Sequence, residues 1–336
     1  MPKARRAPPL KRKSPVLPDA RPANWVDRFA PPRWRPWLKL GRFDRPTGIW
    51  LLMLPGWQGI ALADAMQGRW PDPALLARVL IGAVLMRAAG CAYNDIVDAD
   101  LDARVARTAG RPVASGQIGK RQAWAFLVAC SLVSFVVLLS LNLLAVALGV
   151  ASLALVAAYP FMKRITWWPQ AWLGLTFNWG VPLGFAAALP LPGLAQLATH
   201  AAAAAPPPPA VATPALFLYA AGFFWTLGYD TIYAVQDLED DALAGVKSSA
   251  RRLGRAAPQA VTLFYVAAVI LAACAGATGG LGPLYLPGAG LYAASLLSQP
   301  LRLKLDEPAQ ALALFKSNTL SGLLLFAAVV AGNWRG

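Results

Sequence analysis

Residues 74–102 read ALLARVLIGAVLMRAAGCAYNDIVDADLD, an apolar run of about 20 residues that ends in a cluster of acidic side chains. A helix of about 20 apolar residues is long enough to span the ~30 Å hydrocarbon core of a bilayer. Backbone groups in lipid must be hydrogen-bonded within their own segment, so such a run has to be helical. The segment therefore predicts a membrane-spanning helix that carries acids at one end.

The whole chain has the composition of a membrane protein. Of its 336 residues, 57% are hydrophobic and only 14% are charged, whereas soluble domains average about 25% charged residues. We therefore expect an all-α, polytopic membrane protein with about nine transmembrane helices in a bundle. The predicted spans cover residues 47–66, 74–93, 121–141, 143–161, 169–190, 214–234, 258–277, 279–297 and 311–333.

Positive charge is concentrated toward the N-terminus. The chain contains 31 Lys and Arg against 16 Asp and Glu, and 13 of the 31 lie in residues 1–45. By the positive-inside rule, the N-terminus and the loops after even-numbered spans face the cytoplasm. A polybasic segment beside a membrane is attracted by anionic lipid. We therefore interpret the charge as contact with membrane lipid and predict no nucleic-acid partner.

Two regions of biased composition accompany the predicted membrane domain. Residues 1–36 are basic and rich in proline, and we expect them to form a disordered cytoplasmic arm. Residues 37–336 are the predicted transmembrane domain. Within that domain, an Ala- and Pro-rich insert at 195–213 falls on the outer side, where we interpret it as a linker and not as a site.

Acidic residues are gathered in two short segments. Nine of the 16 lie in residues 94–102 (NDIVDADLD) and 229–241 (YDTIYAVQDLEDD). Both segments come at the cytoplasmic ends of predicted spans, and residues four apart share one face of a helix. Each segment therefore predicts a row of oxygen ligands. The first row is Asn94, Asp98 and Asp102, and the second is Tyr233, Asp237 and Asp241.

Two rows of carboxylates on one side of a membrane are costly unless a cation neutralises them. Ligand sets made only of oxygen atoms favour Mg²⁺. In proteins Mg²⁺ usually keeps water ligands and bridges to substrate phosphates, so we expect a diphosphate to be bound together with the metal. Flanking basic residues could hold its oxygens, and they include Arg107, Arg111 and Lys247. The alternative is that the acids are merely solvated and the basic residues only mark the cytoplasmic side.

The segments around these acids resemble a known family. Residues 94–116 (NDIVDADLDARVARTAGRPVASG) and 228–250 (GYDTIYAVQDLEDDALAGVKSSA) closely resemble the two aspartate-rich motifs of the UbiA superfamily of intramembrane aromatic prenyltransferases. Residues 42–58 and 159–180 are similar to the branch of this superfamily that uses 4-hydroxybenzoate. The resemblance implies a bundle around a central cavity that opens to the cytoplasmic side.

The resemblance also implies a reaction. The expected enzyme is Mg²⁺-dependent and transfers a polyprenyl group from polyprenyl diphosphate to the carbon ortho to the hydroxyl of 4-hydroxybenzoate, in ubiquinone biosynthesis. The implied diphosphate-binding residues are Arg107, Arg111 and Lys247. The implied metal ligands are Asn94 and four aspartates that are also the expected catalytic residues, namely Asp98, Asp102, Asp237 and Asp241.

The acceptor carries a carboxylate, which must find a cation where water is scarce. The candidates for this contact lie at the cytoplasmic ends of the first and fourth spans, and they are Arg45, Tyr159, Lys163 and Arg164. Asp230 and Tyr233 lie deeper in their span, where an acid is costly unless it has a function. With Asp95 they are further candidate site residues.

Two other functions are compatible with the sequence. Another UbiA-type transferase, acting in the haem O, chlorophyll or menaquinone pathway, would share the aspartate motifs. A membrane transporter would use intramembrane acids as a cation path, although its charges would more often lie at mid-membrane. We expect a bacterial inner membrane as the location, and the alternative is the mitochondrial inner membrane, because an Arg-rich leader can be a transit peptide.

Overall fold

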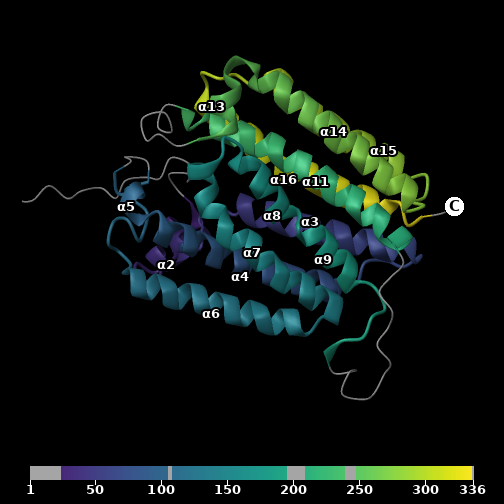
Figure 1. The fold of residues 1–336 in the computed structure, drawn as a ribbon, viewed down its shortest axis with the longest axis horizontal. Coiled ribbons are helices and arrows are strands. Elements are labelled where there is room, and N and C mark those ends of the chain that lie inside the picture. The colour runs from purple at the N-terminus through teal and green to yellow at the C-terminus, as the bar shows by residue number, and fades with distance from the viewer. Residues whose placement is uncertain (1–23, 105–107, 195–208, 239–246, 335–336) are drawn as a thin grey trace, which may run out of the picture.

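The computed structural model describes residues 24–104, 108–194, 209–238 and 247–334, and these ranges are built almost entirely of helices (Figure 1). Within them no strand forms, and the β-structure is limited to an isolated bridge between Asn142 and Gly193. The expected all-α fold is confirmed. In chain order the helices are α1 (Trp25–Phe29), α2 (Arg35–Leu40), α3 (Thr47–Met66), α4 (Pro73–Val97), α5 (Ala99–Asp102), α6 (Lys120–Leu139), α7 (Leu143–Ile165), α8 (Pro169–Asn178), α9 (Gly180–Ala187), α11 (Pro209–Val235), α13 (Ser249–Leu253), the 3-10 helix η1 (Gly254–Ala256), α14 (Ala257–Thr278), α15 (Tyr285–Arg302) and α16 (Pro308–Ala331).

Each predicted apolar segment overlaps a helix of the structure. Among the described residues, six helices are long and apolar enough to cross a membrane. The protein is therefore a multi-pass membrane protein, but the expected number of nine spans is not confirmed by length and composition. The six are Thr47–Met66, Pro73–Val97, Lys120–Leu139, Leu143–Ile165, Ser249–Thr278 and Pro308–Ala331.

The fifth predicted span, residues 169–190, is not a single helix. It is divided at Trp179 into α8 and α9, which have 10 and 8 residues. The cause lies in the first turn of α9, where Pro182 has no N–H to donate to the carbonyl of Asn178. Proline is compatible with an apolar run, so hydrophobicity alone did not reveal this break.

Helices α3 and α9 pack backbone to backbone. A Cβ atom on Gly59 would overlap the carbonyl oxygen of Val181, and a Cβ atom on Gly184 would overlap that of Gly56. In lipid, helices associate chiefly through close van der Waals contact, which small residues at the interface permit. The glycines therefore fix α3 and α9 as one closely packed wall of the bundle.

A buried polar network joins the helices on the other side of α3. The indole of Trp225 (α11) donates to Oδ1 of Asn318 (α16) at 2.8 Å. Gln299 of α15 accepts from Asn318 at 2.9 Å and from the hydroxyl of Tyr265 (α14) at 3.0 Å. Four helices are thus tied together by satisfied buried groups. In Figure 1 α14 and α15 lie on the opposite side of the bundle from α6.

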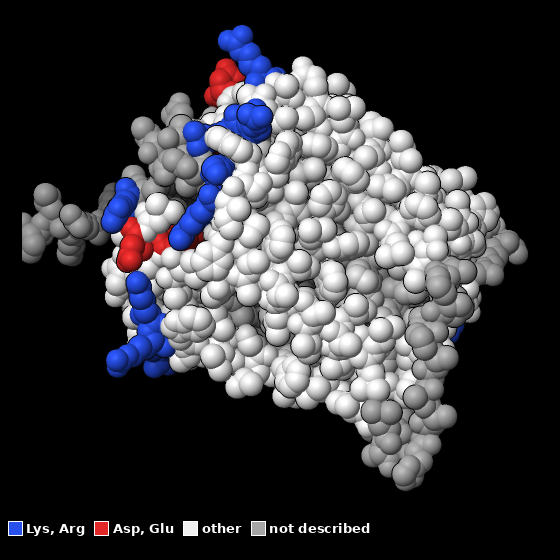
Figure 2. Space-filling view, in the orientation of Figure 1, with Lys and Arg blue, Asp and Glu red and all other residues white. Residues whose placement is uncertain are grey.

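Charged side chains gather at one end of the molecule. Figure 2 shows most of the visible Lys, Arg, Asp and Glu residues there, whereas uncharged residues cover most of the remaining surface of that face. We call this the charged end, and it carries α2, α5 and the last turn of α7. A broad uncharged surface with charge at its edge is the arrangement expected of a bundle in a bilayer.

The C-terminal part of the predicted N-terminal arm is helical. The sequence predicted disorder over residues 1–36, but residues 24–36 contain α1 and the start of α2. These helices are held in place because Trp25 donates to the carbonyl of Phe43 at 2.7 Å and Lys39 pairs with Asp27 at 2.7 Å. Residues 1–23 lie outside the described part of the chain, as does most of the predicted insert, at 195–208.

Candidate functional site

A cavity of about 810 Å³ runs beside α4, between that helix and α3, α6, α7, α8 and α9. Apolar side chains form most of its wall. Several wall residues on α6 and α7 are also exposed on the outer surface, including Val128, Leu132, Phe135, Val150 and Leu153. The cavity is therefore bounded on this side by residues that face the surrounding lipid.

The polar lining of the cavity lies mainly toward the charged end. Arg42, Arg45, Asn94 and Arg111 line the cavity there. Arg87 lies about two helical turns deeper along α4. The cavity thus joins a cationic mouth to a largely apolar interior, which also contains Arg87 and, near the other end of α4, Arg78. This combination suits a ligand with an anionic head and a hydrocarbon tail.

The first acidic row forms as predicted. Helix α4 ends at Val97, but the helical hydrogen-bonding pattern continues, because the N–H of Asp98 donates to the carbonyl of Asn94 at 2.9 Å and the N–H of Asp102 donates to that of Asp98 at 2.8 Å. Asn94, Asp98 and Asp102 therefore share one face. Asp98 is fully buried and Asp102 is 4% exposed.

Each carboxylate of this row is held by cations from other segments. Asp98 accepts hydrogen bonds from Lys163 at 2.5 Å and from Arg164 at 2.9 Å, both in the last turn of α7. Asp102 accepts one from Arg111 at 2.7 Å. Burial raises the pKa of Asp102 even though Arg111 opposes the change. Buried carboxylates of this kind are stable as anions only because cations lie against them.

A second buried ion pair, between Arg42 and Asp95, lies next to this row. Asp95 is 1% exposed and accepts a hydrogen bond from Arg42 at 2.6 Å, while Arg111 lies 3.6 Å away. Arg42 has a φ of 60°, a left-handed conformation that is uncommon for any residue other than glycine. Sequence reasoning missed Arg42, although it lies within the segment RFDRPTG that carried part of the family resemblance.

The second acidic row is only partly described. Helix α11 ends at Val235, Tyr233 lines the cavity, and Asp237 is buried just beyond the helix. Asp241 lies outside the described residues, and so does Arg107.

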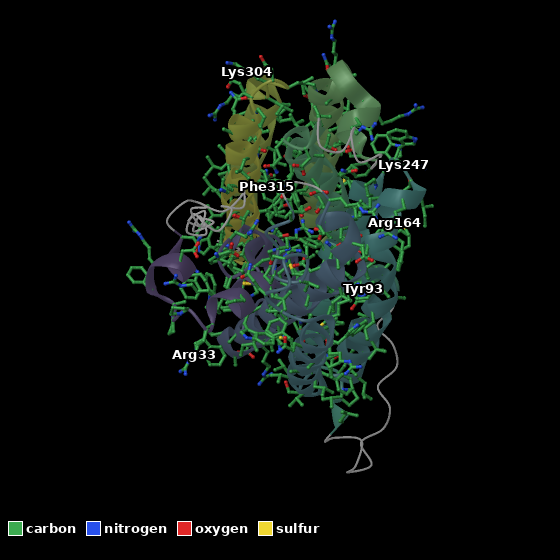
Figure 3. All side chains as sticks on the ribbon, turned by 90° about the vertical axis from the view of Figure 1, so that its left-hand side faces the viewer. Arg33, Tyr93, Arg164, Lys247, Lys304 and Phe315 are labelled. Carbon is green, nitrogen blue, oxygen red and sulfur yellow. The ribbon has the colours of Figure 1, made fainter. Side chains whose placement is uncertain are left out.

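Lys247, which follows the second acidic row in sequence, contacts the last turn of α7. Its backbone N–H donates to the carbonyl of Lys163 at 3.2 Å, and its side chain donates to the carbonyl of Ile165 at 3.1 Å. In Figure 3, which views the charged end, Arg164 and Lys247 lie on the same side of the bundle. Lys247, which follows the second row in sequence, is thus held beside the end of α7, whose Lys163 and Arg164 bind Asp98 of the first row.

The residues predicted for the acceptor divide into two groups. Arg45 and Tyr159 line the cavity, whereas Lys163 and Arg164 bind Asp98 instead. Asp230 is not part of the cavity wall, but it lies within the electrostatic influence of Arg87. Arg87 also lies 5.4 Å from the ring centroid of Phe177, so its position inside a membrane helix is explained by the cavity and these two neighbours.

The donor set is chemically suited to Mg²⁺ but is not a closed metal site. Asn94, Asp98 and Asp102 offer hard oxygen ligands in one row. Within the described ranges, no group of three or more His, Cys, Asp or Glu residues lies close enough to hold a metal ion. This arrangement fits a metal that completes its shell with water and phosphate oxygens, as Mg²⁺ commonly does.

Comparisons with known proteins agree with this geometry. Residues 52–329 match the UbiA prenyltransferase family. The protein "4-hydroxybenzoate polyprenyltransferase, mitochondrial" of Rattus norvegicus is 42% identical over 308 residues, which is 92% of this chain and 77% of the relative. Its counterpart in Homo sapiens is 42% identical over 307 residues, 91% of this chain and 78% of the relative.

Solved structures show the same fold. The apo structure of a UbiA homologue from Aeropyrum pernix K1 has a TM-score of 0.65 and 28% identity, and the match covers 84% of this chain and 96% of that one. A UbiA homologue from Archaeoglobus fulgidus, bound to GPP and Mg²⁺, has a TM-score of 0.59 and 17% identity, with coverage of 88% and 99%. The bundle, the buried acidic row beside the mouth of the cavity and the match over most of the chain lead to one conclusion: this protein is a member of the UbiA prenyltransferase family.

Proposed function

We propose that this protein transfers a polyprenyl group from polyprenyl diphosphate to the ring carbon ortho to the hydroxyl of 4-hydroxybenzoate, in ubiquinone biosynthesis. The observation that carries the proposal is the 42% identity, over most of both chains, to relatives that bear the name of this activity. The cavity supports it, because a cationic mouth and an apolar interior match an anionic head and a hydrocarbon tail.

The aspartate rows are the proposed place of the diphosphate. We assign Asn94, Asp98 and Asp102, together with Asp237 and Asp241, to the binding of Mg²⁺ and thereby of the donor. Bound Mg²⁺ supplies charge neutralisation on the diphosphate as it leaves. Arg107, Arg111 and Lys247 are assigned to its remaining oxygens.

The ion pairs at Asp98 and Asp102 suggest how the site changes when the donor arrives. Lys163, Arg164 and Arg111 neutralise these carboxylates in the ligand-free protein. A divalent cation at the carboxylates takes over that role, and the three cations become available to the diphosphate. Net charge at the charged end is then nearly conserved, so donor binding leaves no carboxylate or cation buried and unpaired.

Arg45 and Tyr159 are the proposed partners of the acceptor, because of the four predicted candidates these two line the cavity. The guanidinium of Arg45 can bind the carboxylate, and the hydroxyl of Tyr159 can donate a hydrogen bond. The apolar wall excludes water, which protects the allylic cation that forms when the diphosphate departs. The acceptor ring then attacks that cation and loses the proton from the attacked carbon.

We also propose a location. The protein is placed in a bacterial inner membrane with its N-terminus in the cytoplasm, which agrees with the excess of Lys and Arg in residues 1–45 and puts the charged end on the cytoplasmic side. The animal relatives are named as mitochondrial. Labelling of a cysteine introduced at Ser115, in an exposed loop of the charged end, would test the orientation in inverted and right-side-out vesicles. The variant would first have its three native cysteines replaced by alanine.

The test of the activity uses membranes that contain the purified protein, radiolabelled 4-hydroxybenzoate, a polyprenyl diphosphate and Mg²⁺. We expect the label to become extractable into organic solvent. Product that forms from the haem O, chlorophyll or menaquinone pathway acceptors, and not from 4-hydroxybenzoate, would indicate another transferase of the family. Absence of any product from folded protein would count against prenyl transfer.

A further inference from the structure

One face of α4 forms the floor of the cavity along its whole length. Every fourth residue of the helix lines it, namely Arg78, Gly82, Met86, Gly90 and Asn94. Residues at this spacing lie above one another on a helix, and the sixteen helical steps from residue 78 to residue 94 correspond to about 24 Å. The next position in the series is Asp98, so the same face leads from the first acidic row through the apolar part of the cavity to Arg78, one turn beyond Gly82.

At two positions on this face, the surrounding packing does not require glycine. A Cβ atom on Gly90 would meet nothing within 4 Å, and one on Gly82 would come no closer than 3.9 Å to Ser134 Oγ. Glycine inside a helix costs about 1 kcal/mol relative to alanine. At Gly59, by contrast, the backbone of α9 leaves no room for a side chain. The absent side chains at Gly82 and Gly90 therefore widen the cavity and do not serve helix packing.

The walls that α6 and α7 contribute to the cavity are mainly hydrocarbon, although Ser131, Ser134 and Ser152 also line them. They include Leu127, Leu132 and Leu138 of α6 and Leu153 and Val156 of α7. A wall of this kind gains most by covering an apolar chain. The space over Gly82 and Gly90 is thus suited to the tail of a donor whose diphosphate lies at the acidic row.

We propose that the prenyl chain lies along this face of α4, with Gly90 beside its first isoprene units and Gly82 beside later ones, so that residue 82 sets the chain length that the enzyme accepts. The proposal rests on the function proposed above. Gly82 lies eight residues, or about 12 Å, beyond Gly90. A large side chain at position 82 would therefore close the far part of the groove and leave the part near the diphosphate unchanged.

The experiment compares a short donor, geranyl diphosphate, with a long one, octaprenyl diphosphate, on the full-length protein and on Gly82→Leu. We expect kcat/KM for the long donor to fall about tenfold or more in Gly82→Leu, while the value for geranyl diphosphate stays within about threefold. Continued use of geranyl diphosphate shows that the variant is folded.

Gly290→Leu is the matched control. Gly290 lies in α15, also has open space around it, and is not part of the cavity wall. We expect the ratio of kcat/KM for the two donors in Gly290→Leu to equal that of the unchanged protein. An unchanged ratio of the two kcat/KM values in Gly82→Leu would overturn the proposal. A folded Gly82→Leu variant that loses activity equally with both donors would also overturn it.

A binding measurement separates this proposal from the proposed function. A ligand that binds the folded state raises the unfolding temperature. With Mg²⁺ present, both donors should raise it for the unchanged protein, and only geranyl diphosphate should do so for Gly82→Leu. If this pattern appears but 4-hydroxybenzoate is not prenylated, the groove assignment stands and the acceptor assignment fails. If neither donor stabilises the unchanged protein, both proposals fail.

Discussion

Lys163 donates a hydrogen bond of 2.5 Å to Asp98, which joins the last turn of α7 to the end of α4. Arg164 reaches the other oxygen of the same carboxylate. Asp98 is fully buried, so these two cations neutralise its carboxylate where no metal is bound. The pair links the acidic row to a helix that also walls the cavity.

The first prediction concerns Asp98. We expect Asp98→Asn to reduce prenyl transfer at least about 100-fold, because one charged ligand is lost and Lys163 is left with a neutral partner. The measurement is product formation normalised to folded protein. Asp100→Asn is the control, since Asp100 belongs to the same motif but its side chain is 88% exposed, and its activity should be unchanged. Equal activity of the two variants would contradict the role of Asp98.

The second prediction concerns the metal. EDTA should stop the reaction, and excess Mg²⁺ should restore it, because the hard oxygen ligands of the acidic row favour this ion. The measurement is turnover at a series of Mg²⁺ concentrations. In Asp102→Asn, which alters the row without removing Asp98, the midpoint of the restoration should move to higher Mg²⁺. Full turnover in the presence of chelator would show that the carboxylates have another role.

The third prediction concerns the buried pair of Arg42 and Asp95. Arg42→Gln leaves Asp95 buried without its closest cation, a change that typically costs about 3–5 kcal/mol. Thermal unfolding of the purified protein in detergent should therefore show a clear decrease in stability for Arg42→Gln. The double variant Arg42→Gln with Asp95→Asn should recover part of the loss, because no unpaired charge remains. Simple addition of the two single effects would mean that the pair is not coupled.

The fourth prediction tests the wall formed by α3 and α9. Gly59→Ala introduces a methyl group against the backbone of Val181, which cannot move aside as a side chain could. We expect loss of folded protein, measured as the monodisperse fraction after extraction in detergent. Gly290→Ala adds the same methyl group where space is open, and it should be neutral or stabilising by up to about 1 kcal/mol. Equal yields of both variants would argue against close α3–α9 packing.

The fifth prediction concerns the N-terminal arm. Deletion of residues 2–22 leaves α1 and the aspartate motifs intact. We expect the KM for the polyprenyl diphosphate to change by less than about threefold, or about 0.7 kcal/mol, because a basic arm of this composition is expected to attract lipid and not the donor. Expression or insertion can decrease without affecting this constant. A rise of tenfold or more, measured on purified protein, would place the arm in the active site.

The sequence predicted the helices well wherever length and hydrophobicity determine them. The first predicted span, residues 47–66, coincides with α3. The row of Asn94, Asp98 and Asp102 was predicted because helical periodicity alone places residues four apart on one face. The break at Trp179 was missed, because it depends on one absent N–H within an apolar run.

Contacts between distant segments were harder to predict. Lys163 and Arg164 were expected to face the acceptor, but in the structure they bind Asp98, 65 and 66 residues away in sequence. The pairing of Arg42 with Asp95 spans 53 residues and was not predicted. Charge pattern indicates on which side of the membrane a residue lies, whereas partners are decided by how the helices pack.

Because the wall of the cavity on α6 and α7 is exposed, the reaction rate should depend on the concentration of the polyprenyl donor within the membrane. Val128, Leu132 and Leu153 face both the cavity and the surroundings of the bundle. A polyprenyl donor dissolved in the bilayer can therefore approach without crossing water, so the relevant quantity is its mole fraction among the lipids. Dilution of the membrane with inert lipid should slow the reaction even when the amount of donor per volume of suspension is constant. Donor binding thus becomes a two-dimensional encounter that depends on membrane composition.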